Sequence, residues 1–512
     1  MMMQHPGLPL PWITHAAIAM GAIVIWCLFA PPVPPALRRI RSLDLATLRW
    51  VGPLVRCIAL SPYPLLAARV VSVAAFLLVI AAGLFGSHYP ERNFATVLVW
   101  NLWWPLVVVS VLFFGTAWCA LCPWTALANW IVRRRLWRRV EPHAGLNLKV
   151  PSYMRNVWMA LLMFMGLTWL EIGLNATGIP VATALMATAM LLLSVLFLLL
   201  FERKAFCRYA CPVGRTLGCY SRVAPLAVRP IEQATCDDCK TLECYRGSAQ
   251  IEPCPTKLTV GRFSQNTYCL SCGNCMLSCP HKNVTWRLRS MGSEATDRTA
   301  SLVDETWFIL ALLGITSFHG LTMMPFWGDW VAAIADAIGD GRSQLVSFTL
   351  AMMVGFAVPA LIYAMAIGLL VPLLPRGTSF KRLFSAFPFV ALPLAFAYHL
   401  AHNMDHLIRE GSEFLSVVAN PLGSGLAPLS AAERHQQMMS VPIPDEWLFT
   451  IQAALMVLGF FLAAQIARQR GADFAGDGLR VTGLQLLPML AFIAAITAMN
   501  LGLMAQGMTM RM

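Results

Sequence analysis

The chain has 512 residues, of which 58% are hydrophobic and 12% are charged, and its mean hydropathy is +0.64. This composition excludes an ordinary soluble globular domain and indicates a polytopic membrane protein. The net charge of +13 does not indicate nucleic acid, because the basic residues gather in short loops between apolar runs, as the positive-inside rule predicts. We therefore expect the lipid bilayer, and no nucleic acid, as a partner.

Five apolar runs precede the cysteine-rich part of the chain, and most are near the ~20 residues that a membrane-spanning helix needs. They cover about 12–30, 70–85, 97–116, 157–174 and 183–201. No basic residue precedes the first run, so we interpret it as an uncleaved span with its N-terminus outside. Arg38, Arg39 and Arg41 follow it, and Arg133 and Arg134 follow the third run, which places both loops inside.

Five more apolar runs follow the cysteines, at about 307–325, 346–374, 384–401, 447–467 and 484–503. Lys381, Arg382, Arg468 and Arg470 mark inner loops, and the acidic segment 403–446 is expected to be an outer loop. Ten spans put both termini outside. We expect a multi-pass protein of the inner (cytoplasmic) membrane.

Most of the fifteen cysteines lie between Phe206 and Pro280. One run, which begins at Cys269 and ends in Pro280, has the C-x2-C-x2-C-x3-C-P spacing of a bacterial ferredoxin. A looser run from Cys236 to Pro255 precedes it. Structural zinc favours two CxxC pairs, and disulfide frameworks belong to small secreted domains. The two runs therefore predict two [4Fe-4S] clusters.

In two-cluster ferredoxins the fourth cysteine of each run ligates the other cluster. This rule predicts one cluster on Cys236, Cys239, Cys244 and Cys279. It predicts the other cluster on Cys269, Cys272, Cys275 and Cys254.

Two further pairs end in Cys-Pro directly behind apolar runs: Cys119 with Cys122, and Cys207 with Cys211. We expect both at the inner membrane surface, where four thiolates suit a third site for an iron-sulfur cluster, zinc or Cu(I). Thiolates beside basic residues are the reactive kind. The alternative is that one pair is buried thiol at a helix end, since free cysteine packs as a small hydrophobe.

Four histidines form a second constellation. His399, His402 and His406 fall at i, i+3 and i+7, which places them on one stripe of a helix. His319 lies near the outer end of the sixth run, so the two groups are expected in one leaflet. Because ionisable residues inside a membrane are costly and usually functional, we expect these imidazoles to hold a b-type haem or a quinone. The alternative is histidines wetted by the outer loop.

The sequence CRYACPVG from Cys207, the earlier Cys-Pro pair and the two-cluster insert together resemble the NapH/NosR-type polytopic membrane 4Fe-4S (polyferredoxin) proteins, over roughly Val97 to Arg289. The resemblance implies electron transfer between the quinone pool and periplasmic respiratory enzymes, or support of the maturation of their metal centres. The usual pair in that family is C-x3-C-P, whereas Cys119 and Cys122 are one residue closer. The resemblance implies no role for the C-terminal half.

We therefore predict an all-α polytopic membrane protein of about ten transmembrane helices with an inserted two-cluster ferredoxin-like domain. The expected division is an N-terminal membrane domain 1–201, a cytoplasmic iron-sulfur domain 202–300 and a C-terminal membrane domain 301–512.

The predicted function is electron transfer that links this cytoplasmic-side module to quinone, to a periplasmic respiratory redox partner protein, or to both, as a subunit of a quinone-linked oxidoreductase. The alternative is a maturation or regulatory factor that supplies electrons or reduces a metal such as copper. A transporter with redox-sensing clusters is disfavoured because the chain shows no inverted repeat.

Overall fold

A computed structural model describes residues 4–30, 42–134, 145–297, 299–375, 378–411, 413–433, 436, 441–474 and 482–509. Arg38, Arg39 and Arg41 of the first predicted inner loop lie outside this set.

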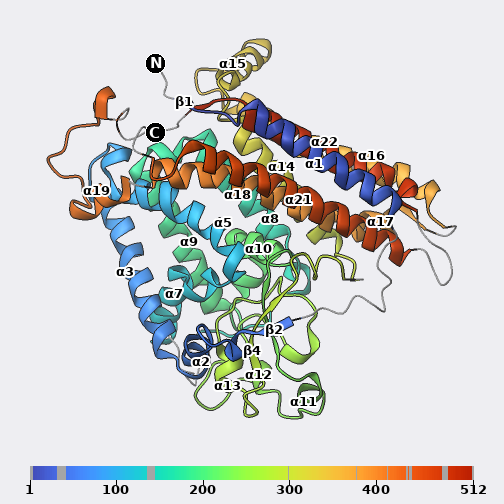
Figure 1. The fold of residues 1–512 in the computed structure, drawn as a ribbon. Helices are drawn as coiled ribbons and strands as arrows, with labels where there is room; N and C mark the ends of the chain where they lie inside the picture. The colour runs from blue at the N-terminus through green and yellow to red at the C-terminus, as the bar shows by residue number, and fades with distance from the viewer. Residues whose placement is uncertain are drawn as a thin grey trace.

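Each of the ten predicted apolar runs forms a helix (Figure 1). The N-terminal five are α1 (Leu10–Phe29), α3 (Tyr63–Phe85), a continuous helix from α4 (Phe94–Thr96) through a π-helical turn (Val97–Trp103) to α5 (Trp104–Phe114), α8 (Trp158–Thr168) with a π-helical extension (Trp169–Gly173), and α9 (Pro180–Leu200). The C-terminal five are α14 (Val303–Leu321), α16 (Leu345–Leu370), α18 (Ala391–Glu410), α21 (Asp445–Asp473) and α22 (Leu487–Ala505).

Among the described residues, eight helices are long and apolar enough to cross a membrane on their own. The helix Trp158–Gly173 is shorter, and α14 begins with Asp304 and Glu305. The protein is thus a mainly helical, polytopic membrane protein, as predicted. Shorter helices complete the membrane part: α6 (Trp118–Leu121), α7 (Pro123–Arg133), α10 (Pro212–Tyr220), α15 (Trp327–Ile338), α17 (Phe380–Ala386) and α19 (Glu413–Ala419).

Helix α18 is the centre of the helical bundle. In the segment Phe380–Glu410 that contains it, 89% of the most apolar window is buried, against 17% for α1 and for α3. It packs against α5, α14, α21 and α22. The prediction of a loop from Asn403 is wrong at its start, because α18 continues to Glu410. The helix can continue because its polar side chains are buried with partners rather than exposed to solvent.

The insert forms a small module at one end of the bundle (Figure 1). It holds a three-stranded antiparallel sheet in the order β2 (Ser42–Asp44), β4 (Val284–Arg289), β3 (Leu226–Pro230), together with α11 (Gln233–Asp237), α12 (Glu243–Arg246) and α13 (Asn274–Ser278). Strand β2 comes from the loop after α1, and the following α2 (Gly52–Leu60) also contacts α13. The module therefore recruits a segment far from it in sequence.

Helix α10 holds the insert against the bundle. The guanidinium of Arg215, which is buried, donates to the carbonyl oxygen of Thr267 at 3.0 Å, and Arg222 donates to the Thr267 hydroxyl at 2.6 Å. Gly218 lies on the same helix, and a Cβ there would meet the Thr267 carbonyl oxygen at 2.0 Å. The absence of a side chain at Gly218 is what permits this close approach.

The two ends of the described chain meet at the opposite end of the molecule from the insert (Figure 1). Strand β1 (Gln4–His5) pairs antiparallel with β5 (Met508–Thr509), with His5 opposite Met508. Both terminal strands therefore lie on one side, the far side from the insert.

Gly218→Ala is expected to push α10 and the Thr267 loop apart, since neither backbone can give way cheaply. We expect the free energy of unfolding to fall by about 1–3 kcal/mol, the usual cost of overpacking, and the iron content to fall as well. Thermal unfolding and iron analysis of the purified protein would measure both. Gly166→Ala is the control, because a Cβ at Gly166 meets nothing within 4 Å; equal effects of the two changes would contradict the docking role of Gly218.

Candidate functional site

Four cysteines from both runs line one small cavity in the insert. They are Cys236, Cys239, Cys244 and Cys279. The first three come from the earlier run, and Cys279 comes from the end of the later one. The structure thus brings together the crossed set that the ferredoxin rule predicts.

The complementary set lines a second cavity: Cys254, Cys269, Cys272 and Cys275. Val260 borders both cavities, so the two sets are neighbours. The loop between Cys269 and Cys275 turns through two residues of positive φ, Ser271 at 49° and Gly273 at 78°. This left-handed backbone curls the loop around the cavity.

Backbone amides point at several of these sulfurs. The N–H of Leu258 donates to Cys254 Sγ at 3.2 Å, and the N–H of Asn283 donates to Cys279 Sγ at 3.4 Å. The Asn283 side chain also donates to Cys236 Sγ, at 3.5 Å. Such N–H···S bonds stabilise negative charge on cluster ligands and raise cluster potentials.

The two Cys-Pro pairs also converge, between the insert and the membrane helices. Cys119 lies on α6, Cys122 precedes α7, Cys207 lies in a π-helical turn (Phe206–Ala210), and Cys211 precedes α10. Ionisation of Cys211, Cys122 or Cys207 would raise the pKa of the Cys119 thiol, because all three lie near it. The start of α10 at Cys211 therefore lies beside the start of α7 at Cys122, although Cys119 and Cys122 are more closely spaced than Cys207 and Cys211.

Burial raises the pKa of the Cys207 thiol to about 12, although the Lys204 ammonium lowers it. Burial likewise raises the pKa of the Cys122 thiol. As bare groups these thiols are neutral, and a bound metal centre would supply the positive charge that turns them into thiolates.

The spacing of the sulfurs bears on which metal centre fits. Four ligands on one zinc ion, each about 2.3 Å from it, lie less than ~4 Å from one another. Among the described residues, no three cysteine sulfurs lie within 4.8 Å of one another. A cubane holds its thiolates farther apart, because each binds a different iron. In each of the three sets the sulfurs therefore lie farther apart than the ligands of a single zinc ion.

Lys204 lies between the Cys-Pro pairs and the insert. Its backbone N–H donates to the carbonyl oxygen of Pro255 at 3.1 Å, and Pro255 lines the cavity of the nearer insert set. The Thr116 hydroxyl, just before Cys119, is 2.9 Å from the Ser271 hydroxyl. The three sets of cysteines therefore form a row that leads from the insert to the membrane helices.

The predicted histidines contact different partners. The Tyr220 hydroxyl is 3.1 Å from His399 Nδ1, and the His399 ring also contacts Trp104. The His319 and His402 rings meet edge to face with centroids 5.4 Å apart, as expected for helices that share a leaflet.

Two acidic partners of these histidines were not predicted. His319 Nε2 lies 3.2 Å from a carboxylate oxygen of Glu171, which comes from the π-helical extension of α8. His406 Nδ1 lies 2.8 Å from Glu410. The i,i+4 spacing of His406 and Glu410 was a signal in the sequence, whereas nothing in the sequence links Glu171 to His319.

A cavity of about 440 Å³ lies between the cysteine pairs and the histidines. Its walls come from α3, the Val97–Trp103 turn, α7, α8 and α9. Pro123 and Pro212, which follow Cys122 and Cys211, border it, and so does Glu171. The wall is mostly apolar and includes five tryptophans: Trp100, Trp103, Trp104, Trp118 and Trp124.

A protein-family model described as a 4Fe-4S binding domain matches the chain twice, at residues 96–140 and 183–228. Each match contains one Cys-Pro pair together with the helix before it. Around these two segments the chain is similar to the NapH-type membrane polyferredoxins. It therefore carries a 4Fe-4S binding domain together with membrane-length apolar helices. The shorter pair at Cys119 and Cys122 falls within the first match, and the longer pair at Cys207 and Cys211 falls within the second.

The chain is 28% identical to the "Putative electron transport protein YccM" of Escherichia coli (strain K12) over 160 residues, which are 31% of this chain and 40% of that protein. It is 32% identical to the "Ferredoxin-type protein NapH" of Haemophilus influenzae over 101 residues, 19% of this chain and 34% of that protein. The matches thus span less than half the length of either relative. No solved structure matches the chain.

Pairs of cysteine substitutions test the crossed ligand sets. Cys279→Ala with Cys236→Ala should remove about four irons, because both residues line one cavity, whereas Cys279→Ala with Cys275→Ala should remove about eight. Iron and acid-labile sulfide in anaerobically purified protein measure this. Cys57→Ala, at an exposed cysteine, is the control. The reverse order of losses would mean that each run holds its own cluster.

Proposed function

We propose that this protein transfers electrons between the insert and a quinone in the 440 Å³ cavity, by way of a third cubane on the two Cys-Pro pairs. The observation that carries the proposal is the position of the cavity. Pro123 and Pro212 border it on the side of the cysteine pairs, and Glu171 borders it on the side of the histidines.

The row of cysteine sets supports a single electron path. The sets at Cys236 and at Cys254 share the wall residue Val260. Lys204, just before Cys207, donates its backbone N–H to the Pro255 carbonyl oxygen in the wall of the second cavity. The order is therefore the outer insert cluster, the inner insert cluster, the membrane-surface cluster and the cavity.

The cavity has the properties that a quinone ring needs. Its volume falls within the ~300–1,000 Å³ of ordinary small-molecule sites, and its aromatic walls suit a flat, apolar ring. Val71, which lines it, is 70% exposed on the surface of α3, so the cavity reaches the lipid-facing side. A quinone could enter from the bilayer without crossing water.

The couple of quinol and quinone exchanges two electrons and two protons. Glu171 is the ionisable residue among those that line the cavity, and one of its carboxylate oxygens lies 3.2 Å from His319 Nε2. Glu171 would accept the two quinol protons in turn and pass each toward His319, while the two electrons leave one at a time through the Cys-Pro pairs. The reverse sequence reduces quinone.

Haem fits this region less well. A porphyrin with two axial histidines must lie between their rings, but the rings of His319 and His402 are already in edge-to-face contact at 5.4 Å. His399 is held by Tyr220 and Trp104 instead. We therefore assign His319, with its neighbour His402, to quinone and proton chemistry.

Three cubanes predict about twelve irons per chain, rather than the eight of two ferredoxin clusters. Cys211→Ala should lower the count by about four and leave the insert clusters intact, because Cys211 lies outside both insert cavities. Iron and sulfide analysis measures this. A count of eight that Cys211→Ala does not change would remove the third cluster, and with it this path.

Filling the cavity should block quinol without harming the clusters. Ala75 lines the cavity, whereas its neighbour Ala74 is exposed on the same helix. Ala75→Phe is expected to slow bleaching of the cluster absorbance by a short-chain quinol at least tenfold, while Ala74→Phe reacts like the native protein.

Reduction by dithionite, which needs no binding site, should be equally fast in both variants and serves as the internal control. Clusters that quinol reduces equally fast in Ala75→Phe and Ala74→Phe would place the quinone elsewhere. Clusters that quinol does not reduce in the native protein would instead favour a maturation factor.

A further inference from the structure

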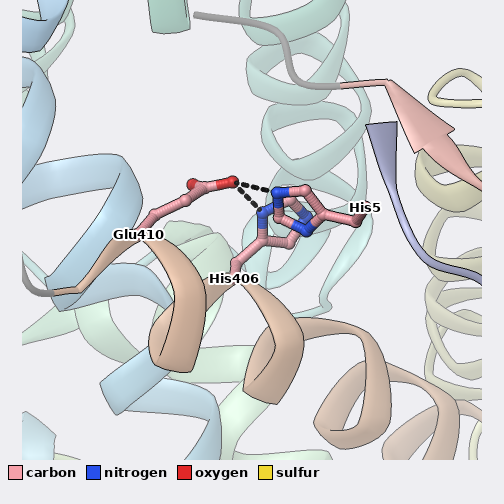
Figure 2. Close-up of side chains that lie close together, drawn as sticks. All are labelled: His5, His406 and Glu410. Atoms are coloured by element: carbon pink, nitrogen blue, oxygen red, sulfur yellow. Dashed lines mark hydrogen bonds and ion pairs between the residues drawn. The ribbon is translucent and has the colours of Figure 1, made fainter. Parts of the chain in front are cut away.

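Three side chains outside the electron path converge on the far side of the membrane bundle (Figure 2). They are His5 of strand β1 and His406 and Glu410 of helix α18. One donor atom from each lies within 4.8 Å of the other two. His5 and Glu410 are buried, and His406 is nearly so.

The distances between the donor atoms match those around one metal ion. His406 Nδ1 is 2.8 Å from Glu410 Oε1, and His5 Nε2 is 3.5 Å from the same oxygen. Two ligands that each lie about 2.1 Å from a metal are separated by roughly 3.0–3.4 Å at octahedral and tetrahedral angles. The two dashed contacts in Figure 2, at 2.8 and 3.5 Å, lie within about 0.2 Å of the length of such a ligand-to-ligand edge.

His5 is oriented for such a role. Its Nδ1 is 2.6 Å from the Asp405 carboxylate, while its Nε2 is buried without a hydrogen-bond partner and faces Glu410. The side chain is 1% exposed, so no solvent satisfies that nitrogen. A carboxylate on one imidazole nitrogen and a metal on the other is the usual arrangement for a ligating histidine.

Among the described charged residues around His5, His406 and Glu410, no cation other than a protonated imidazole balances the Glu410 carboxylate. Arg409 bonds Asp405 at 2.9 Å and Asp445 at 2.7 Å, so it is already shared between two acids. The ion-pair partners of Glu410 among the described residues are the two imidazoles. Buried charges need a counter-charge, and a metal ion would supply it while the imidazoles stay neutral.

The fold holds the donors in place. The His5 strand is pinned by its pairing with β5, and Leu8 N–H donates to the Met504 carbonyl at the end of α22. Gly7 approaches the Ala505 carbonyl oxygen so closely that a Cβ would lie 2.3 Å from it. On α18, the i,i+4 spacing puts His406 and Glu410 on one face.

We propose that His5 Nε2, His406 Nδ1 and Glu410 form a site for one divalent first-row transition-metal ion. Two imidazoles and one carboxylate favour such ions over Ca²⁺ and Mg²⁺, which prefer all-oxygen ligands. Three protein ligands leave coordination positions open. Asp405 is a positioning residue, which orients His5 without touching the metal. The site stands independently of the quinone proposal.

His406 and Glu410 also line a small cavity whose wall includes His319 and Glu171. Glu171, Trp100 and Trp104 line this cavity and the 440 Å³ cavity alike. The metal site therefore adjoins the far end of the proposed quinone cavity, while its ligands take no part in the cysteine row.

The test uses full-length protein that is treated with a chelator and titrated with Co²⁺, with the cubanes kept oxidised and diamagnetic. Equilibrium dialysis and the electron paramagnetic resonance of high-spin Co²⁺ report binding. The native protein should bind one Co²⁺ more than the double variant His5→Ala, Glu410→Gln. His15→Ala, at an exposed histidine of α1, is the matched control and should bind like the native protein.

Asp405→Asn should weaken Co²⁺ binding about 10- to 100-fold while the three ligands remain, as loss of an outer carboxylate partner usually does. Co²⁺ should also raise the unfolding temperature of the native protein but not that of Glu410→Gln, because only a native-state site couples binding to stability. Equal iron content, together with equal unfolding temperatures in the absence of Co²⁺, shows that the variants fold.

Equal Co²⁺ binding by the native protein and the double variant overturns the proposal. The cluster would then be a set of ion pairs in which protonated imidazoles neutralise Asp405 and Glu410. If the double variant does not fold, an unfolding temperature of the native protein that does not respond to Co²⁺ overturns it equally. Neither result bears on quinol reduction of the clusters.

Discussion

A cubane presents four corners, and one tight loop reaches only three of them, so the fourth ligand must come from elsewhere in the chain. In the insert, Cys254 and Cys279 are exchanged between the two runs. At the membrane surface the four cysteines come as two pairs, each at the end of a separate helix. This requirement explains much of the fold of the insert and its position against the helical bundle, since segments that share a set of thiolates must lie together.

Helix α18 is governed by a different constraint. It is buried on nearly all sides, yet it carries three histidines, two acids and an arginine between His399 and Glu410. In a low-dielectric interior each of these groups needs a partner. Tyr220, His319 and His5 come from three other segments to supply contacts. The polar half of α18 thus contacts segments from three distant parts of the chain.

The features that the sequence predicts are those that depend on residues close to one another along the chain. Cysteine spacing and the ferredoxin rule predict both insert sets, and apolar runs predict the helices. The polar end of α18 was predicted as loop, because its charged side chains look solvent-exposed until their partners are known. His5 lies 400 residues from Asp405, and no periodicity connects them. The tryptophan cavity likewise depends on how α3, α8 and α9 pack, which spacing along one helix does not encode.

The pairing of β1 with β5 affects the order in which the molecule is assembled. Strand β1 precedes the first long helix and β5 follows α22, so the two cannot meet until every intervening helix has been synthesised and inserted. His5 therefore reaches Asp405 and Glu410 only as a late event in biogenesis. A chain stalled or truncated before α22 could already fold its cysteine-rich module on the other side, but it would leave the buried carboxylates of α18 without their amino-terminal partner. The pairing of β1 with β5 thus distinguishes a chain that includes α22 and β5 from a shorter one.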